Sequence, residues 1–270
     1  MAQPELFELE LFGEGIEKRY RKMRPEVEAM PWGTLSTEGL DEKALIAARK
    51  SWTGAAFQEH RTAIACAATL RALLELRAPL DLIALAARFP LDELVHVELC
   101  ARMAMELGGG TELVHDPDSM IVDANEADTP LLRAADLVTR FFCVGEALSI
   151  PLLRGTWHAA KHPLPRAVLG RIVKDEAAHG TFGFAFLEWA GDKLTPGDRE
   201  FLGKQADRVV RVIQRQWESI RNGGARPVRE NDPLAWMESS AYLALADRSM
   251  RERVVRPLLR AGIPVSAHPA

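Results

Sequence analysis

Six residues of this 270-residue chain have the types and the spacing of metal ligands. Two short stretches are nearly identical, DELVH from Asp92 to His96 and DEAAH from Asp175 to His179. Each places a Glu and a His three residues apart, so that both side chains lie on one face of a helix and reach one ion. Two lone glutamates complete the set, which in chain order is Glu59, Glu93, His96, Glu146, Glu176 and His179.

This order of ligands is typical of helical bundles that hold two metal ions in the core. Such bundles use a lone Glu from each of two helices and a Glu-x-x-His from each of the other two. Glu59 and Glu146 both lie in apolar surroundings, where an uncompensated carboxylate is costly. Two bound cations would compensate these charges, so the pattern predicts a dinuclear metal site.

Four long helices must position the six residues, and the sequence provides four helix-favouring segments. They are predicted over about residues 40–77, 80–107, 128–150 and 165–194. Pro90 predicts a kink or a restart in the second helix, and Pro151 an end or a kink in the third. The third helix is then followed by a connecting loop over residues 157–165. Residues 108–128 lack a helical period and fit a long crossover between the second and third helices.

The predicted hairpin turns place the glutamates at similar depths in the bundle. The turns fall near Ala78 and His162. The glutamates before and after each turn lie 14 to 19 residues from it, and a helix rises by about 1.5 Å per residue. A chance meeting of six ligand-type residues at one level is therefore improbable.

The whole chain is predicted to be all-α, with the architecture of a ferritin-like four-helix bundle and two additional C-terminal helices. Residues 1–36 form an N-terminal arm and residues 37–270 a single domain. The four-helix core covers about residues 40–192, and the C-terminal helices about 195–262.

Composition and charge exclude several other classes of protein. The net charge of −4 argues against a nucleic-acid partner, which normally meets a basic face. The sequence has neither an apolar segment long enough to cross a membrane nor a secretory signal, so no membrane partner is expected. Three isolated cysteines predict free thiols in a reducing compartment, which makes the cytoplasm the predicted location.

The ligand pattern resembles that of the ferritin-like di-iron carboxylate superfamily over residues 40–192. That superfamily includes ferritins, the small subunit of ribonucleotide reductase, acyl-carrier-protein desaturases and the hydroxylase subunits of bacterial multicomponent monooxygenases. The chain lacks a Cys-x-x-Cys pair, unlike rubrerythrins. Its only tyrosines, Tyr20 and Tyr242, lie outside the four helices, which argues against a stored tyrosyl radical. Ile172 stands where the arylamine N-oxygenases of the superfamily carry an extra histidine.

The resemblance implies a role for each candidate ligand. Glu59 and Glu146 would be the terminal ligands, and Glu93 and Glu176 would bridge the two irons. His96 and His179 would each bind one iron. The acid that precedes each Glu-x-x-His, Asp92 or Asp175, would accept a hydrogen bond from a ligand histidine and so orient its ring.

Two side chains near the ligands have more than one interpretation. Ser149 lies one turn after Glu146 and could donate a hydrogen bond to a bound oxygen species or to its own helix backbone. His60 is turned away from the ligands on its helix, so we expect it to be satisfied elsewhere or exposed rather than to act as a seventh ligand.

Carboxylate and imidazole ligands with open positions favour iron or manganese over zinc. Two iron ions are the predicted cofactor, with a manganese–iron pair or manganese as alternatives. The predicted function is a non-haem di-iron oxidoreductase, such as a monooxygenase, that uses dioxygen, an electron donor and a small organic substrate. A ferroxidase or another iron-handling protein is the alternative, and a scaffold without metal is the third interpretation. A homodimer is left open.

Overall fold

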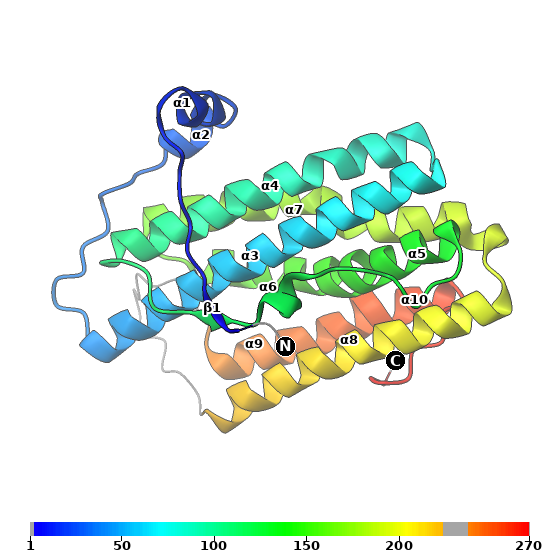
Figure 1. The fold of residues 1–270 in the computed structure, drawn as a ribbon. Coiled ribbons are helices and arrows are strands. Elements are labelled where there is room, and N and C mark those ends of the chain that lie inside the picture. Colours follow the sequence, from blue (N-terminus) through cyan, green and yellow to red (C-terminus); the bar gives the residue numbers. More distant parts are fainter. Residues whose placement is uncertain (1–2, 224–236, 270) are drawn as a thin grey trace.

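The computed structural model describes residues 3–223 and 237–269, and these residues are predominantly helical, as the sequence predicts (Figure 1). The α-helices are α1 (Glu14–Lys22), α2 (Pro25–Glu28), α3 (Glu42–Leu76), α4 (Leu80–Glu106), α5 (Pro130–Leu137), α6 (Ala147–Ala159), α7 (Pro163–Ala190), α8 (Pro196–Asn222), α9 (Ser239–Ser249) and α10 (Arg256–Arg260). Two π-helices, η2 (Val138–Glu146) and η4 (Met250–Val255), and two 3₁₀ turns, η1 (Pro117–Met120) and η3 (Gly191–Lys193), interrupt or follow them.

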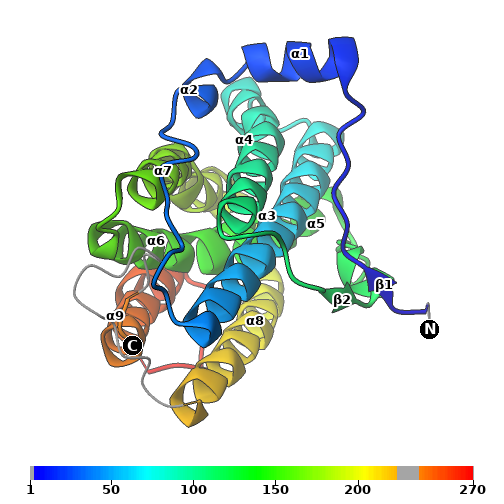
Figure 2. The same cartoon turned by 90° about the vertical axis from the view of Figure 1, so that its left-hand side faces the viewer.

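Three long helices and one composite helix lie side by side around a common interior (Figures 1 and 2). Helix α3 contacts α4 and α5, α4 contacts α7, and α7 contacts η2 and α6. Helices α8, α9 and α10 form a further layer, in which α8 contacts α5 and η2 while α9 and η4 contact α6. The predicted C-terminal helical region includes residues 224–236, which lie outside the described residues.

The third predicted helix is longer than the sequence suggested. It begins after Thr129, whose side chain accepts a hydrogen bond from the backbone N–H of Leu132 at 3.1 Å. It then continues through η2 and past Pro151 to Ala159, so an end at Pro151 and a loop over residues 157–165 are both wrong. Pro90 likewise lies inside α4 without restarting it. A proline removes one backbone hydrogen bond, and the packing of these helices on their neighbours outweighs that loss.

The N-terminal arm and the segment between α4 and α5 meet in a small antiparallel pair of strands. Strand β1 (Glu5–Leu6) pairs with β2 (Val114–His115), with Glu5 opposite His115. Between β1 and α3 the arm passes over the bundle, where α1 and α2 lie against the outer side of α4 (Figure 2). No helix in residues 3–223 and 237–269 is both long enough and apolar enough to span a membrane.

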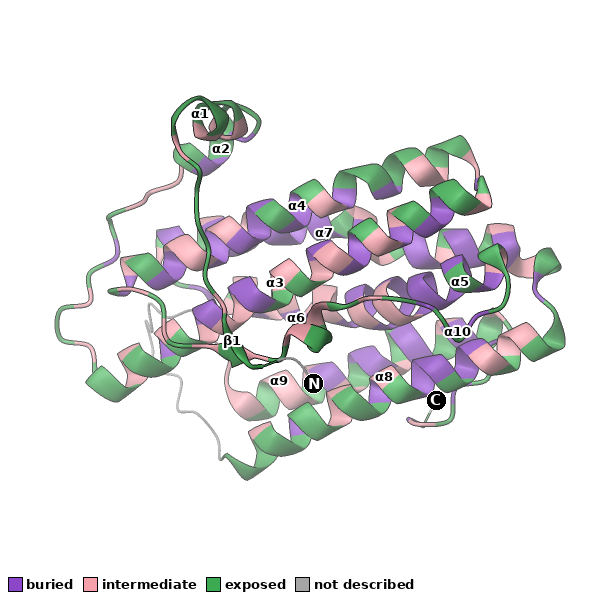
Figure 3. Ribbon diagram, viewed as in Figure 1, coloured by how far each residue is buried: buried purple, intermediate pink, exposed green. Residues whose placement is uncertain are grey.

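Two apolar clusters fill the interior, which is buried along the facing sides of the helices (Figure 3). On α4, Phe89 belongs to one cluster and Leu99 to the other. On α7, Phe182 and Ile172 divide between the clusters in the same way. The candidate ligands fall between these positions on both helices, so a buried polar layer separates the two clusters.

Candidate metal centre

All six predicted ligands converge in this polar layer. They come from α3 (Glu59), α4 (Glu93 and His96), the last position of η2 (Glu146) and α7 (Glu176 and His179). They form two overlapping groups, and within each group the potential ligand atoms lie within 4.8 Å of one another. One group contains Glu59 and His96, the other Glu146 and His179, and both contain Glu93 and Glu176. These two shared carboxylates therefore lie between two candidate ion positions.

The cluster is shielded from solvent and short of hydrogen bonds. Glu93, His96 and His179 are 0% exposed. Both carboxylate oxygens of Glu93 and the Nδ1 atoms of both histidines are buried and have no hydrogen-bond partner among the described residues. Buried polar atoms are normally satisfied, and an absent ion is one explanation for atoms that are not. Several of these orphaned atoms belong to one cluster, which fits a metal ion.

Both histidines present Nδ1 to the carboxylates that the two groups share. The Nδ1 atom of His179 lies 3.0 Å from Glu93 and 3.1 Å from Glu176. The Nδ1 atom of His96 lies 3.3 Å from Glu176 and 3.5 Å from Glu93. An ion between these groups would bind Nδ1, which leaves Nε2 to donate a hydrogen bond.

The Nε2 atom of each histidine faces the aspartate of the other motif. His96 Nε2 lies 3.3 Å from Asp175, and His179 Nε2 lies 3.6 Å from Asp92. The first distance is a hydrogen bond, and the second is slightly too long to be one. A carboxylate behind a ligand histidine fixes the ring and raises its basicity. The pairing crosses from α4 to α7, so each Glu-x-x-His depends on the other helix.

The pKa values of the cluster reflect crowded negative charge. Burial and the charge of Glu93 raise the pKa of Glu59 to about 8, although the nearby His96 lowers it. Burial and the charges of Glu176 and Glu93 raise the pKa of Glu146 well above its usual range. Burial alone would lower the pKa of His179, but the nearby carboxylates of Asp92, Glu176 and Glu93 raise it to about 12. The cluster therefore favours positive charge, which metal cations would supply.

A π-helix places Glu146, the third of the four candidate glutamates. Glu146 is the last residue of η2, where the backbone winds more widely than an α-helix. Gly183 on α7 lets η2 approach closely, because a Cβ atom there would lie 2.7 Å from Cys143 Sγ. π-Helical turns are frequent at functional sites. The sequence analysis missed this element, since an apolar run gives no periodic signal that separates π- from α-helix.

Two arginines that the sequence analysis did not single out support the aspartates. Arg88 Nε lies 2.9 Å from Asp92, and its Nη2 lies 3.4 Å from Asp175. Arg171 Nε donates to Asp175 at 2.7 Å. Each arginine stands four residues before its aspartate, so both motifs have the longer form R-x-x-x-D-E-x-x-H. This repeated spacing places Arg and Asp on one helix face and could have revealed both residues.

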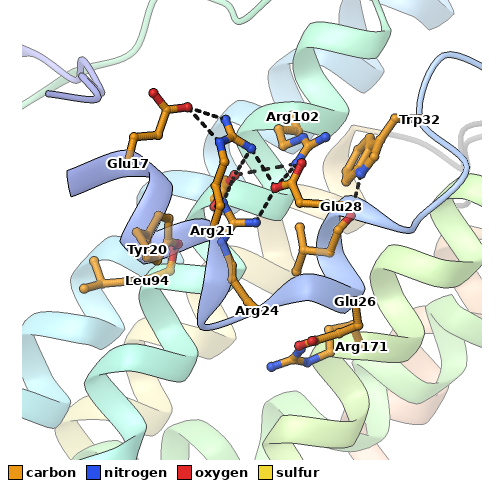
Figure 4. Close-up of polar contacts among 12 residues, drawn as sticks. Glu17, Tyr20, Arg21, Arg24, Glu26, Glu28, Trp32, Leu94, Arg102 and Arg171 are labelled. Atoms are coloured by element: carbon orange, nitrogen blue, oxygen red, sulfur yellow. Dashed lines mark hydrogen bonds and ion pairs between the residues drawn. The ribbon is translucent and has the colours of Figure 1, made fainter. Parts of the chain in front are cut away.

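The N-terminal arm is fastened to the helices that carry the two motifs (Figure 4). Arg24 is only 2% exposed and forms ion pairs of 2.6 Å with Glu28 on α2 and with Glu98 on α4. Glu26 on α2 pairs with Arg171 on α7. A chain of contacts therefore runs from the arm through Arg171 and Asp175 to His96. Because Glu98 follows His96 by two residues, the arm meets α4 close to the candidate site.

The remaining predicted side chains have simpler roles. Ser149 Oγ can donate to the backbone carbonyl of Glu146 at 3.1 Å, as expected for a helix serine, or to the Glu146 carboxylate at 3.2 Å. His60 packs edge-on against Phe7, with ring centroids 5.7 Å apart, and is not in either metal-binding group. The three cysteines are free and buried.

Comparison with known proteins does not place the chain in a family. No protein-family model matches the sequence, and no curated protein matches it either.

Proposed function

We propose that the chain is a ferritin-like protein whose buried cluster binds two iron ions and activates dioxygen to oxidise or oxygenate a small organic substrate. The observation that carries this proposal is the pair of overlapping groups that share Glu93 and Glu176. Manganese in one or both positions would suit the same oxygen-rich ligands. The reducing electrons would come from an external donor.

The arrangement of helices supports the ferritin-like part of the proposal. Ferritin-like bundles join their second and third helices by a long crossover. Here the segment from Leu107 to Thr129 joins α4 to α5 and contains only β2 and a short 3₁₀ turn. The candidate ligands also follow the order expected of such a bundle.

The protein's own residues would hold the ions, orient the ligands and exclude water. Glu59 and Glu146 would each bind one ion, Glu93 and Glu176 would bind both, and each histidine would bind through Nδ1. Two reduced irons supply the electrons for activating dioxygen. Asp92 and Asp175 would keep the proton of each imidazole on Nε2, so that Nδ1 remains free to bind metal. Phe89, whose ring centroid lies 4.1 Å from that of His179, would keep water from this side of the centre.

Metal analysis and oxygen uptake test the proposal together. Protein made in iron-supplied cells should contain about two irons per chain, the number that bundles with this ligand set hold. Its reduced form should consume dioxygen with a transient change in visible absorption, and a substrate should accelerate the decay of that change. A protein that binds no transition metal after unfolding and refolding with iron would refute the proposal. Decay that no organic compound accelerates would refute the oxygenase part.

A ferroxidase would use the same ligands, and assembly distinguishes the two functions. Iron storage needs a large hollow assembly and many irons per chain. Helix α8 covers α5 and η2, while α9 and η4 cover α6, and this extra layer favours the enzyme. A monomer or dimer with a fixed small number of irons would exclude storage, whereas a large assembly that takes up iron continuously would exclude the oxygenase.

A further inference from the structure

A cleft of about 820 Å³ lies beside the candidate metal centre, between α6, α7 and the C-terminal η4–α10 segment. Ala147, Ala177 and Gly180 line it. These are the residues that directly follow the candidate ligands Glu146, Glu176 and His179. The cleft therefore runs along the part of α7 that carries Glu176 and His179, and along the start of α6, which directly follows Glu146 on η2. Clefts of this size accommodate small organic ligands.

Part of the cleft lining is apolar. Ile150 from α6 and Phe184 from α7 line it, and both are half-buried. Ile150 lies against Gly180, where a Cβ atom would be only 2.2 Å from Ile150 Cδ1. The two helices can approach this closely because residue 180 has no side chain. An apolar group in the cleft would therefore contact the place where Ile150 of α6 packs on Gly180 of α7, next to His179.

Another part of the cleft lining is charged, with more arginines than glutamates. Four arginines and two glutamates line it, although the whole chain carries a net charge of −4. Arg199 is already used, since it donates to the backbone carbonyls of Ala261 and Gly191. Arg154, Arg253 and Arg260 are exposed and form no hydrogen bond or ion pair with other residues in the described part of the chain. Three guanidinium groups from α6, η4 and α10 thus line the cleft without a polar partner among the described residues.

We propose that this cleft binds an amphiphilic organic anion. Its carboxylate or phosphate group would be held by Arg154, Arg253 and Arg260, and its apolar part would lie against Ile150 and Phe184. The charge-assisted hydrogen bonds of arginine suit both kinds of anion. If the proposed oxygen chemistry is correct, such an anion is its substrate, and this part of the inference rests on the proposed function.

Calorimetry on the full metal-loaded chain tests the apolar and the charged lining of the cleft separately. The ligands to compare are decanoate, decyl phosphate, decanol and inorganic phosphate. Decanoate or decyl phosphate should bind at least about tenfold more tightly than decanol or inorganic phosphate, which each lack one of the two groups. The double variant Arg154→Gln, Arg253→Gln should weaken binding of the anion about tenfold or more and leave decanol unchanged. Thr181→Trp, which fills the cleft from an exposed position on α7, should weaken both ligands.

Arg133→Gln is the matched control, because Arg133 is exposed on α5 and does not line the cleft. Equal affinities for decanoate and decanol, or equal effects of the control and the double variant, would overturn the inference. Iron content of the same preparations separates it from the proposed function. Iron-loaded wild-type protein that binds neither anion would refute the cleft alone. Wild-type protein that binds decanoate but retains no iron would refute the metal chemistry alone.

Discussion

The two R-x-x-x-D-E-x-x-H motifs are alike in sequence, but their surroundings differ. Asp175, behind His96, contacts both Arg88 and the mostly buried Arg171, which in turn pairs with Glu26 of the N-terminal arm. Among the described residues, Asp92 behind His179 pairs with one arginine, Arg88, whose side chain is 54% exposed. The better supported aspartate is also closer to the histidine it faces. Asp175 lies 3.3 Å from His96 Nε2, and Asp92 lies 3.6 Å from His179 Nε2.

This difference shows that a repeated motif does not give the two candidate metal positions equal surroundings. The position at His96 is supported by a network that extends from α7 to α2. The position at His179 depends on a side chain that water can reach, and exposed ion pairs contribute little. We therefore expect the ion beside His96 to be held more firmly than the ion beside His179.

The largest effect should come from the carboxylates that both groups share. Glu93→Ala or Glu176→Ala should abolish binding of both ions, because each removes a ligand from both positions. Glu59→Ala and Glu146→Ala should each weaken mainly one position. Metal content measured by mass spectrometry on the four proteins checks this. Loss of a single ion from Glu93→Ala would contradict a shared role.

Removing the aspartates should separate the two positions. A partner behind a metal-ligating histidine typically contributes 10–100-fold to metal affinity. We expect Asp175→Asn to reach the upper part of this range and Asp92→Asn the lower part, because the Asp175 contact is shorter and better supported. Competition with a chelator measures both affinities. A larger loss of metal affinity in Asp92→Asn than in Asp175→Asn would mean that the position beside His179 is the better supported one.

The arginines should differ in their effect on folding. Arg171→Gln leaves the buried Asp175 with one fewer partner and should lower the free energy of unfolding by about 1–3 kcal/mol. Arg88→Gln removes a more exposed group and should cost less than about 1 kcal/mol. Urea unfolding of the metal-free proteins provides the measurement. Glu26→Gln tests how much of the effect of Arg171→Gln comes from the contact with the N-terminal arm. Equal losses of stability in the two arginine variants would contradict the stronger support of Asp175 than of Asp92.

The smallest effect concerns pH. Glu59 has a pKa of about 8 in the folded metal-free protein, above the usual value of 4.5. The folded state therefore binds more protons than the unfolded state between these values, and this contribution to stability falls as pH rises through that window. Metal binding must displace the proton, so apparent metal affinity should rise with pH over the same window. Thermal unfolding and metal titrations at pH 5, 6, 7 and 8 test both trends.

Glu59→Gln provides the control for this pH dependence. The variant cannot lose a proton at residue 59, so the stability of its metal-free form should fall less steeply with pH than that of the wild type. Identical slopes would mean that other groups, such as His179, account for the whole effect.

Much of the candidate site could be predicted because helices turn regular spacing into shared faces. The interval of three residues between Glu93 and His96 fixes their common face wherever the helix lies. The helical segments and the cap at Thr129 were predictable for the same reason, since they depend on local sequence. The effect of Pro151 was not, because a proline ends a helix only when packing does not compensate for the lost hydrogen bond.

The sequence by itself determined the types of the candidate ligands, their order and the helical segments that carry them. Only the tertiary structure decided that Asp175 faces His96 rather than its own His179, that η2 winds as a π-helix, and that the arm reaches the site through Arg171. These features depend on contacts between residues far apart in the chain. Local spacing cannot specify them, because they are fixed by how the surfaces of α4, α7 and their neighbours pack together.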